Sequence, residues 1–532
     1  MSDPAELGPH GKPWSKTGPG GHFDVVVIGS GMGGQAAAAL LAEVGRRVLL
    51  LEQHYEPGGF THTFRRGPWR WDVGVHAVGE VTPRSLPGRI LRWLSGGQLE
   101  WASLGSTYDR FLFPGDFRID FPDSPEQFKE NLLAAAPKER AGIDEYFRAV
   151  REVAGAMRLY YLARLAPPSW GYLADHTLAR RAQAFLEERT APRIARLTQD
   201  PRLAALLTAQ WGYYGSTPSR SSFAMQALVA KHFWWGGYYP VGGSQQIART
   251  LLGSVASQGG WTRIATPVRK ITVEGGRAVG VELEDGERIR APRVISAVGV
   301  AATCARLLPA ELSRAPWAKS VAELTPAPAH VCLYLGLNGD PRPAGASAAN
   351  QWLYETWSME ASAWEIERTP IPDAPVLYVS FPSLKDPRHQ GVHHTAEVVT
   401  FVPYGAFERW QGTRWRKRGE DYEAFKAQLT ERLLAQLYRH LPGLRPLIAH
   451  AELSTPLSTD KFARPMAGSI YGLEPTPERF ANPYLRPRSP IPGLYFAGSE
   501  VATVGVIGAL MGGVLAAAAA DPVSVLSALR RL

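Results

Sequence analysis

The pattern of hydrophobic and polar positions changes at Phe23, where a polar opening rich in Gly and Pro gives way to apolar runs. Residues 24–28 end in four β-branched side chains, which is typical of a buried parallel strand. Residues 35–44 are rich in Ala and Leu and predict a helix, and residues 47–51 predict a second strand. A strand, a helix and a strand in this order indicate an α/β fold with a parallel sheet.

Three glycines, Gly29, Gly31 and Gly34, connect the first strand to the helix in the pattern G-x-G-x-x-G. The first permits a tight turn, the second lets a pyrophosphate approach the backbone, and the third lets helix and strand pack closely. Glu52 ends the second strand, 18 residues after Gly34, where an acid accepts hydrogen bonds from a ribose diol and repels a 2′-phosphate. The unit predicts a Rossmann-type dinucleotide-binding domain.

The hydrophobic pattern of residues 85–235 is different, with amphipathic helices at 124–136 and 143–163 and a short aromatic strand at 108–113. Aromatic side chains are dense between residues 211 and 239. Two interpretations stay open for them: ordinary core packing, or an apolar tunnel for a long hydrophobic substrate.

Strand and turn signals return after residue 239. A helix is expected at 245–258, followed by antiparallel strands at 266–274, 280–283 and 289–291 and a buried strand at 293–299. Further strands are expected at 329–337 and 397–403, in a sheet that roofs the ligand.

Near the C-terminus, a strand is expected to deliver Gly498, and a glycine-spaced helix begins near Val506. The free N–H groups at the start of that helix suit the electron-rich edge of a bound ring. A single site is therefore expected to draw on both ends of the chain.

Composition narrows the class of protein. The chain has 532 residues, 45% of them hydrophobic and 20% charged, which describes a globular protein of more than one domain. Its two cysteines, Cys304 and Cys332, lie in apolar surroundings, so neither a disulfide framework nor a zinc site is expected. His393 and His394 are expected in a polar surface loop without a carboxylate partner, so no metal site is predicted.

The net charge is +9, and four of its cations surround Trp415 in residues 414–418. This cluster suits either a solvated surface or contact with anionic lipid headgroups, and nucleic-acid binding is not expected because no binding module accompanies it. The first 22 residues lack the apolar core of a signal peptide, and no stretch reads as a transmembrane span. A cytoplasmic protein that is peripheral on the inner membrane face is expected.

Two motifs carry a resemblance to a known family: Gly58-Gly59-Phe60-Thr61-His62-Thr63-Phe64 and Trp71-Asp72-Val73-Gly74-Val75-His76. They resemble the flavoproteins of the phytoene desaturase and carotenoid isomerase superfamily, and most of all its retinol saturase group. Residues 383–387, 402–404 and 468–472 are similar to that group as well. Wider relatives place Arg directly after the glycine pair, where this chain has Phe60, so Arg65 or Arg66 is the substitute candidate.

The resemblance implies a flavoprotein with two dinucleotide-binding-type domains and non-covalent FAD. The residues then expected to contact FAD are Gly29, Gly31, Met32, Gly33, Gly34, Glu52, Gln53, Gly58, Gly59, Thr61, Arg65, His76, Val268, Ala297, Gly299, Gly498, Ser499, Glu500, Gly505, Val506, Ile507 and Ala509.

The resemblance also implies an enzyme that acts on carbon–carbon double bonds of an apolar, retinoid- or carotenoid-like polyene, with saturation of one double bond first. Desaturation and redox-neutral cis–trans isomerisation through reduced FAD stay open, and so does a non-catalytic lipid-binding escort. His76 and Glu500 are the candidates for moving a proton. Only one G-x-G-x-x-G occurs, so NAD(P)H is expected at most as a transient electron donor.

The domain boundaries follow from the same changes of pattern. Residues 1–22 are expected to be a flexible tail. The expected FAD domain comprises 23–84, 236–324 and 466–532, and the expected α+β substrate domain comprises 85–235, with possible membrane contact, and 325–465. Nothing in the sequence indicates the oligomeric state.

Overall fold

A five-stranded parallel sheet carries the N-terminal unit in this computed structural model, which describes residues 11–18 and 20–532. Its strand order is β19-β13-β1-β2-β9, and every neighbouring pair is parallel. The strands are β1 (Val25–Ile28), β2 (Val48–Leu51), β9 (Trp261–Arg263), β13 (Val294–Ser296) and β19 (Leu494–Phe496). The chain returns to this sheet from distant segments, and the predicted α/β class is confirmed.

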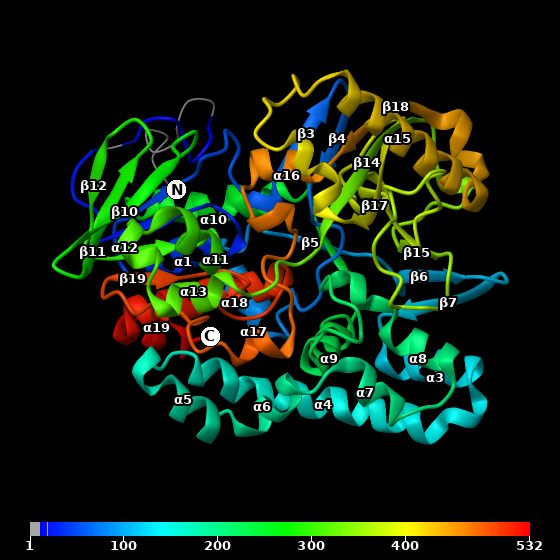
Figure 1. The fold of residues 1–532 in the computed structure, drawn as a ribbon, viewed down its shortest axis with the longest axis horizontal. Helices are drawn as coiled ribbons and strands as arrows, with labels where there is room; N and C mark the ends of the chain where they lie inside the picture. Colours follow the sequence, from blue (N-terminus) through cyan, green and yellow to red (C-terminus); the bar gives the residue numbers. More distant parts are fainter. Residues whose placement is uncertain (1–10, 19) are drawn as a thin grey trace.

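Alternate residues of β1 face two different cores. Val25 and Val27 pack with the helices on one face, and Val26 and Ile28 pack on the other. The first face is covered by α1 (Met32–Glu43), α10 (Gln245–Ser257), α18 (Gly505–Ala520) and α2 (Leu86–Leu94). The second carries β10 (Val268–Glu274), β11 (Arg277–Leu283), β12 (Arg288–Arg290), α11 (Val300–Ala302) and α13 (Pro316–Ala322). The result is a three-layer domain, on the left in Figure 1.

A seven-stranded sheet forms the second half of the molecule, in the order β18-β14-β17-β16-β15-β6-β7. All neighbours are antiparallel except β15 and β6. The strands are β6 (Thr107–Phe113), β7 (Phe117–Pro122), β14 (Ala329–Asn338), β15 (Asn350–Tyr354), β16 (Val376–Ser380), β17 (His393–Val402) and β18 (Ile448–Ser454). Two chain segments, separated by more than 200 residues, therefore share one sheet.

The two faces of β14 pack against different parts of the molecule. Val331, Leu333 and Leu335 pack in the outer core, which is covered by α15 (Glu420–His440). Cys332 and Tyr334 face the hairpin of β3 (Thr63–Arg66) and β4 (Trp69–Asp72). The alternation places this hairpin between the sheet and the parallel-sheet domain.

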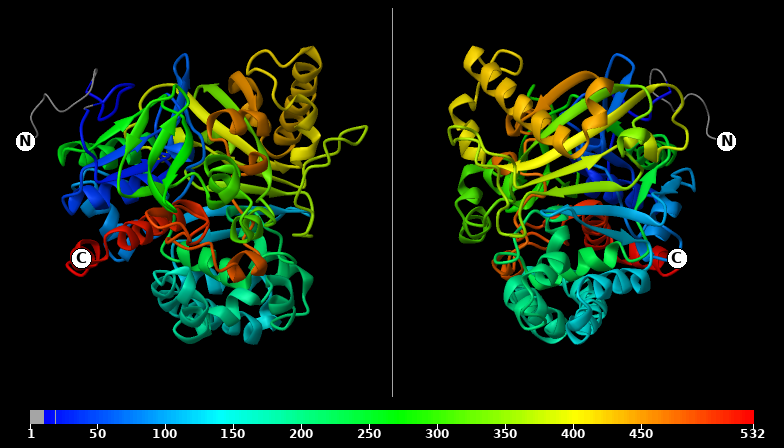
Figure 2. Two further views of the ribbon diagram at one scale, coloured as in Figure 1. Left: turned by 60° about the vertical axis from the view of Figure 1, so that its left-hand side comes forward. Right: turned by 90° about the vertical axis from the view of Figure 1, so that its right-hand side faces the viewer.

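A layer of helices closes a third side, running along the bottom of Figure 1 and of both views in Figure 2. It consists of α3 (Pro125–Ala135), α4 (Arg140–Ala163), α5 (Pro168–Thr177), α6 (Arg180–Glu187), α7 (Thr190–Ala195), α8 (Pro201–Thr208) and α9 (Phe223–His232). The buried face of α4 repeats at Ile143, Phe147, Val150 and Val153, as an amphipathic helix requires.

Shorter elements connect these layers. They include β5 (Trp101–Ser103), β8 (Tyr238–Pro240), α12 (Ala310–Ser313), α14 (Pro382–Lys385), α16 (Pro456–Phe462), α17 (Pro477–Ala481) and α19 (Pro522–Leu529). Within the described part of the chain, no helix is both long enough and apolar enough to span a bilayer.

The structure corrects three sequence predictions. The tail prediction fails for the described residues 11–18, because Trp14 is buried and Ser15 bonds to the backbone of β9; residues 1–10 lie outside the described part. Helix α1 begins at Met32 and not at Gln35, since helical backbone tolerates its two glycines. His393 and His394 begin β17, and His394 is buried against Ser383.

Candidate functional site

One cavity of about 1410 Å³ joins both ends of the chain to the seven-stranded sheet. Nearly all the predicted cofactor residues line it: Gly29, Gly31, Met32, Gly33, Glu52, Gln53, Gly58, Gly59, Thr61, His76, Val268, Ala297, Gly299, Gly498, Ser499, Glu500, Gly505, Val506, Ile507 and Ala509. The structure thus brings these positions to one space, and their contacts with a ligand stay predictions.

The glycine loop between β1 and α1 has the geometry that a pyrophosphate requires. Gly29 has φ +92°, a conformation that favours glycine. A Cβ on Gly34 would lie 1.9 Å from the carbonyl oxygen of Gly29, so this glycine is fixed by packing and does not line the cavity. A Cβ on Gly31 would meet no protein atom within 4 Å. Gly31 is therefore the point where the loop leaves room for a ligand.

Glu52 lies at the edge of the cavity with its side chain largely buried. Oε2 accepts hydrogen bonds from the backbone N and from Oγ of Ser30, at 2.9 and 2.5 Å. Oε1 accepts from the backbone N of His54 at 2.8 Å. A carboxylate offers about four acceptor positions, so Glu52 is oriented by the protein and keeps capacity for a ribose hydroxyl.

Helix α18 from the C-terminal segment packs directly on α1. A Cβ on Gly33 would lie 2.6 Å from Cα of Gly498, and one on Gly513 would lie 2.3 Å from the carbonyl oxygen of Gly33. Such spacing allows only glycine, and it places the first turn of α18 on the cavity wall. At Gly505 a Cβ would meet open space, whereas at Gly508 it would lie 1.9 Å from the carbonyl oxygen of Thr503. Gly505 consequently faces the cavity, and Gly508 allows the first turn of the helix to pack closely against the backbone of Thr503.

Arg65 and Thr61 have different surroundings from those expected of FAD contacts. Arg65 is exposed on β3 and does not line the cavity, whereas Arg66 lines it and pairs with Glu452 at 2.7 Å. Alternation along the strand points neighbouring side chains to opposite faces, which explains the difference. Thr61 donates to the carbonyl oxygen of Gly58 at 2.8 Å, so it closes the glycine turn.

Glu500 is buried and bound to backbone. Its Oε2 accepts from the N–H groups of Val300 and Ala301 at 2.6 and 3.2 Å, at the start of α11. Burial raises the pKa of this carboxyl group, and the buried Arg479 nearby opposes that shift. These contacts tie β19 to the residues after β13, so Glu500 has a structural task at the position where a proton relay was predicted.

One part of the remaining cavity wall is apolar and aromatic. It includes Phe233, Trp352, Tyr378, Phe401 and Tyr471. Three buried polar atoms on this wall have no partner in the described residues: Trp352 Nε1, Tyr378 OH and His330 Nδ1. Of the aromatic side chains at 211–239 in the described chain, Tyr213 and Phe233 line this cavity, whereas most of the others pack in the core. The core-packing interpretation therefore describes most of them, and a substrate tunnel stays a prediction for the cavity.

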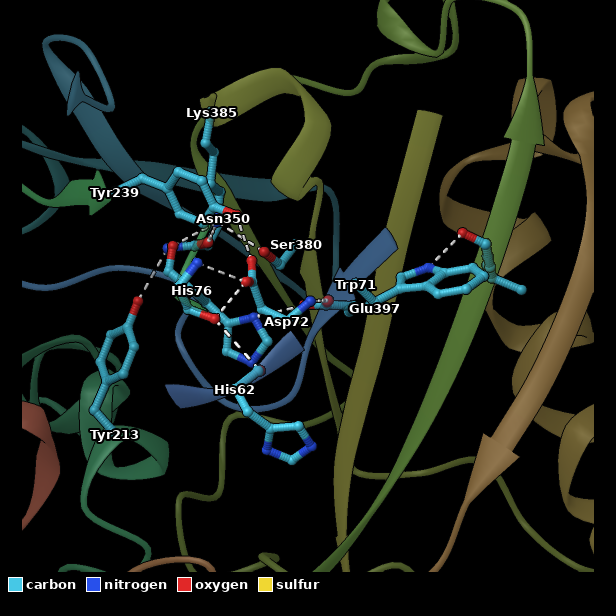
Figure 3. Close-up of polar contacts among 12 residues, drawn as sticks. His62, Trp71, Asp72, His76, Tyr213, Tyr239, Asn350, Ser380, Lys385 and Glu397 are labelled. Carbon is cyan, nitrogen blue, oxygen red and sulfur yellow. Dashed lines mark hydrogen bonds and ion pairs between the residues drawn. The ribbon is translucent and has the colours of Figure 1, made fainter. Parts of the chain in front are cut away.

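His76 lines the cavity and belongs to a buried polar network, which Figure 3 shows. Its Nδ1 lies 2.8 Å from Oε2 of Glu397 on β17, and its backbone oxygen accepts from Nζ of Lys385 at 2.7 Å. Lys385 also donates to Asn350 Oδ1 at 2.5 Å and to Ser380 Oγ at 2.7 Å. All three protons of the ammonium group are therefore held by neutral oxygen atoms.

Two further carboxylates belong to this network. Asp109 accepts from Tyr213 OH at 2.7 Å and from Asn350 Nδ2 at 2.9 Å. Asp72 accepts from the backbone N and from Oγ of Ser244, at 2.9 and 2.5 Å, and also from Tyr239 OH. One buried ammonium group thus lies among three buried carboxyl groups.

Burial controls the protonation of this network. It lowers the pKa of His76 to about 3, with the charge of Lys385 adding to the effect. It lowers the pKa of Lys385 to about 8 against the pull of Glu397, and it raises that of Asp109 to about 6. Burial, with Asp72 beside it, raises the pKa of Glu397 well above its ordinary value. His76 is therefore uncharged at neutral pH, and the burial of Glu397 beside Asp72 favours the protonated form of Glu397.

Sequence reasoning identified His76 and missed Lys385, Glu397, Asp109 and Asn350 as site residues. The signal for Lys385 was present, because it lies in residues 383–387, which resemble the retinol saturase group. The others come from separate strands of the seven-stranded sheet, and no local spacing connects them.

The basic cluster at 414–418 lies partly at the cavity and partly on the exposed surface. Trp415, Arg416 and Arg418 line the cavity, and Trp415 packs on Phe462 with 5.3 Å between ring centroids. Arg418 is buried and donates to the carbonyl oxygens of Thr413 and Leu457. Arg414, Arg416 and Lys417 are exposed, so both interpretations, solvated surface and lipid contact, stay open for them.

Comparison with known proteins agrees with this geometry. The chain matches the family described as flavin containing amine oxidoreductase over residues 32–520. It is 32% identical to all-trans-retinol 13,14-reductase of Homo sapiens over 519 residues, which cover 93% of this chain and 85% of that protein. It is 26% identical to the chloroplastic prolycopene isomerase of Daucus carota over 510 residues, with 93% and 79% covered.

The fold is also that of solved structures. Putrescine oxidase bound to putrescine superposes with a TM-score of 0.61, covering 95% of this chain and 100% of that chain at 17% identity. This likeness concerns the fold alone. The family match spans most of the chain, and the retinol reductase shares nearly a third of its residues. The chain is therefore an FAD-dependent oxidoreductase and belongs to the flavin containing amine oxidoreductase family.

Proposed function

We propose that this protein uses FAD to saturate one carbon–carbon double bond of a long apolar polyene of the retinoid or carotenoid type. The observation that carries this proposal is the continuous cavity, which runs from the glycine loop to an aromatic wall distant from it in sequence. A polyene is flat, apolar and poor in hydrogen-bonding groups, which suits that wall. Relatives named for retinol and for prolycopene support the same class of substrate.

The chain's residues fit FAD. The glycine loop and the start of α1 suit the pyrophosphate, Glu52 suits the ribose, and the first turn of α18 suits the ring. When bound, FAD supplies hydride chemistry, and the protein supplies position and proton control. The N–H groups at the start of α18 carry partial positive charge, which favours an anionic ring.

The test uses purified holoprotein. FAD is photoreduced without oxygen, and a panel of retinoids and carotenoids is added one at a time. We expect one class to reoxidise the flavin and to give a product heavier by two hydrogen atoms. Failure of every polyene to reoxidise the flavin, with an electron acceptor such as oxygen still active, would contradict the proposal.

Desaturation and cis–trans isomerisation use the same cavity, and the relative named prolycopene isomerase keeps isomerisation as the second candidate. Product mass separates the three reactions. Saturation adds two hydrogen atoms, desaturation removes two, and isomerisation leaves the mass unchanged while it alters retention on a column.

The electron donor belongs to the proposal as well. NAD(P)H is proposed as a transient donor, because the parallel sheet carries only one glycine loop of the dinucleotide type in the described residues. Rapid mixing of oxidised holoprotein with NADPH or NADH under anaerobic conditions measures flavin bleaching directly. Slow flavin bleaching by both NADPH and NADH would indicate that the electron donor is an electron-transfer protein.

We also propose that the protein docks on an anionic membrane surface through the helical layer, from the cytoplasmic side. Trp170, Tyr172 and Leu173 on α5 are 63%, 71% and 53% exposed. Leu159 and Leu162 at the end of α4 are exposed beside them in sequence, and Tyr161 between them lines the cavity. The exposed cation Arg158 lies on α4, and the exposed Arg180 and Arg181 begin α6, which follows α5 in the chain. Apolar side chains with neighbouring cations suit a lipid interface.

Liposome flotation tests this docking surface. Binding is expected to increase with anionic lipid and to fall at high salt. A Trp170→Ser and Leu173→Ser double variant is expected to float less, and Val523→Ser, at an 82% exposed position on α19, is the matched control. Equal flotation of the double variant and the control would contradict the assignment.

A further inference from the structure

The polar network behind His76 contains more buried ionisable groups than are needed to hold one histidine side chain in place. Glu397 is fully buried, and so are the carboxylates of Asp72 and Asp109 and the ammonium group of Lys385. Burying this many ionisable groups is costly, and such clusters concentrate at sites that use them. Among the described residues that line the cavity, His76 and Tyr213 contact this network directly, and His76 is the one in contact with Glu397.

The three carboxyl groups differ in how many donors reach them. Asp72 accepts three hydrogen bonds, from Tyr239 and twice from Ser244. Asp109 also accepts three, from Tyr213, Asn350 and Gln210. Glu397 receives one, from the backbone N of Asp72 to Oε1 at 3.0 Å. A buried carboxylate with so few donors is poorly stabilised, so Glu397 is the group that keeps a proton.

The contact with His76 then fixes where each proton lies. Oε2 of Glu397 has no other partner in the described residues, and it lies 2.8 Å from Nδ1 of His76. A protonated carboxyl group donates to Nδ1, so the single proton of the neutral imidazole lies on Nε2. The Nδ1 atom is enclosed, whereas the side chain as a whole is 15% exposed on the cavity. The ring therefore presents an N–H donor to a ligand.

We propose that Glu397 is the internal proton source of this site, acting through His76, with Lys385 stabilising the carboxylate that remains. Saturation of a double bond requires one hydride and one proton. Nε2 of His76 gives its proton to a substrate carbon, which forms the second new C–H bond. Nδ1 takes the proton of Glu397 at the same time, so the imidazole stays neutral and the negative charge moves to Glu397. Water in the cavity returns the proton through His76 after the product leaves.

Lys385 occupies the position that this charge movement needs. Its ammonium group interacts with the charge of Glu397, and its three donors are fixed on His76 O, Asn350 Oδ1 and Ser380 Oγ. The bond to the backbone of His76 holds the cation beside the histidine whichever protonation state Glu397 has. His76 is the catalytic residue in this scheme, and Glu397 and Lys385 are positioning residues.

This inference rests on the proposed saturation of a double bond. Its test uses the Glu397→Gln variant, because a glutamine fits the same contacts. The amide oxygen still accepts from the backbone N of Asp72, and the amide N–H still donates to Nδ1 of His76. The variant lacks only a proton to transfer. A purely structural role predicts full rescue by glutamine, whereas a proton source predicts none.

The readouts are applied to the flavin-loaded protein. Histidine ¹⁵N resonances report the tautomer of His76, and the infrared spectrum reports the carbonyl stretch of a protonated carboxylic acid. We expect the Nε2–H tautomer in the wild type and in Glu397→Gln, and a carboxylic acid band that the variant lacks. Polyene reduction is expected to fall at least about 100-fold in the variant, with unchanged FAD content. Thr395→Val, on the same strand and with an unpartnered buried hydroxyl, is the control and is expected to keep its activity.

Three outcomes decide the inference. An Nδ1–H tautomer in the wild type would overturn it, because Glu397 would then be an acceptor. Polyene reduction by Glu397→Gln at half the wild-type rate or more would overturn it as well. If the wild type reduces no polyene but shows the Nε2–H tautomer and the carboxylic acid band, the proposed substrate is wrong and the proton source is supported.

Discussion

The two ends of the cavity are built in different ways. The nucleotide end is formed mainly by backbone atoms, and packing restricts which residues fit there. At Gly29, Gly33 and Gly34, a Cβ would meet protein atoms within 2.8 Å. The wall at His76 is made of side chains, and its demands are electrostatic, since Lys385 and three carboxyl groups are buried together. Backbone requirements act over a few residues, whereas the polar network joins segments up to 325 residues apart. A side chain added at Gly29, Gly33 or Gly34 is therefore expected to disturb the nucleotide end, whereas removal of a charged group is expected to disturb the wall at His76.

Removal of the ammonium group gives the largest expected effect. Lys385→Met leaves three buried carboxyl groups without their cation, and we expect a loss of about 3–5 kcal/mol in the free energy of unfolding. Urea denaturation of the holoprotein measures it. Lys319→Met, at an exposed position on α13, is the control and should change stability by less than about 0.5 kcal/mol. Equal stability of the two variants would mean that the network is not held by its cation.

This contrast also decides what could be predicted from the sequence. The βαβ unit, its glycines and Glu52 follow from local spacing, and the structure places them as expected. Pairing of the C-terminal segment with the N-terminal one was predicted from the need to complete a ring site, and α18 does pack on α1. The network around Lys385 could not be predicted, because its members meet only when β4, β6, β15 and β17 pack together.

The sequence left two further assignments open. Both Arg65 and Arg66 were candidates for the arginine near the glycine pair, because strand alternation makes the two exclusive and only the packed structure shows which side chain faces the cavity. The cations at 414–418 suited either a solvated surface or lipid contact; Arg414, Arg416 and Lys417 are exposed, whereas Arg418 is buried and bonds to the backbone of Leu457, which is distant in sequence. The sequence shows which side chains are charged, but tertiary contacts determine whether each of them is exposed to solvent.

The steric character of the nucleotide end is tested by two alanine substitutions. Gly34→Ala places a Cβ 1.9 Å from the carbonyl oxygen of Gly29, so we expect a loss of about 3 kcal/mol of stability together with loss of FAD. Gly31→Ala meets no protein atom, so we expect normal thermal stability of the protein without FAD and a loss of FAD affinity. Melting curves and flavin absorbance measure both. Full FAD content in Gly31→Ala would show that the pyrophosphate lies elsewhere.

A smaller effect is expected where the nucleotide end uses a side chain. Glu52→Ala removes the acceptor predicted for the adenosine ribose, and FAD affinity should weaken by about 1–3 kcal/mol. Glu52→Gln keeps the shape and an acceptor oxygen and should lose less. Fluorescence titration of the protein stripped of flavin gives both dissociation constants. Unchanged affinity in the alanine variant would remove Glu52 from the cofactor site.

The smallest effect concerns pH and the second buried histidine on the cavity wall. Burial lowers the pKa of His330 to about 4, with His76 adding to the effect, and the ordinary value in an unfolded chain is 6.5. Between pH 6.5 and pH 4 the unfolded chain therefore binds a proton at this position that the folded protein does not. The free energy of unfolding must fall as the pH is lowered through this range, by up to about 1.4 kcal/mol per pH unit from this one group.

The carboxyl groups with raised pKa values, Asp109 and Glu397, act in the opposite direction, so the total slope of the wild type does not isolate His330. The His330→Leu variant does, because the other groups are common to both proteins. Urea denaturation at pH 4, 5, 6 and 7 is expected to show the wild type losing stability faster than the variant as the pH falls. Parallel curves would mean that the unpartnered Nδ1 of His330 reaches water or a partner in solution. In that case the wall at His76 is wetter, and its electrostatic demands are weaker, than the buried network requires.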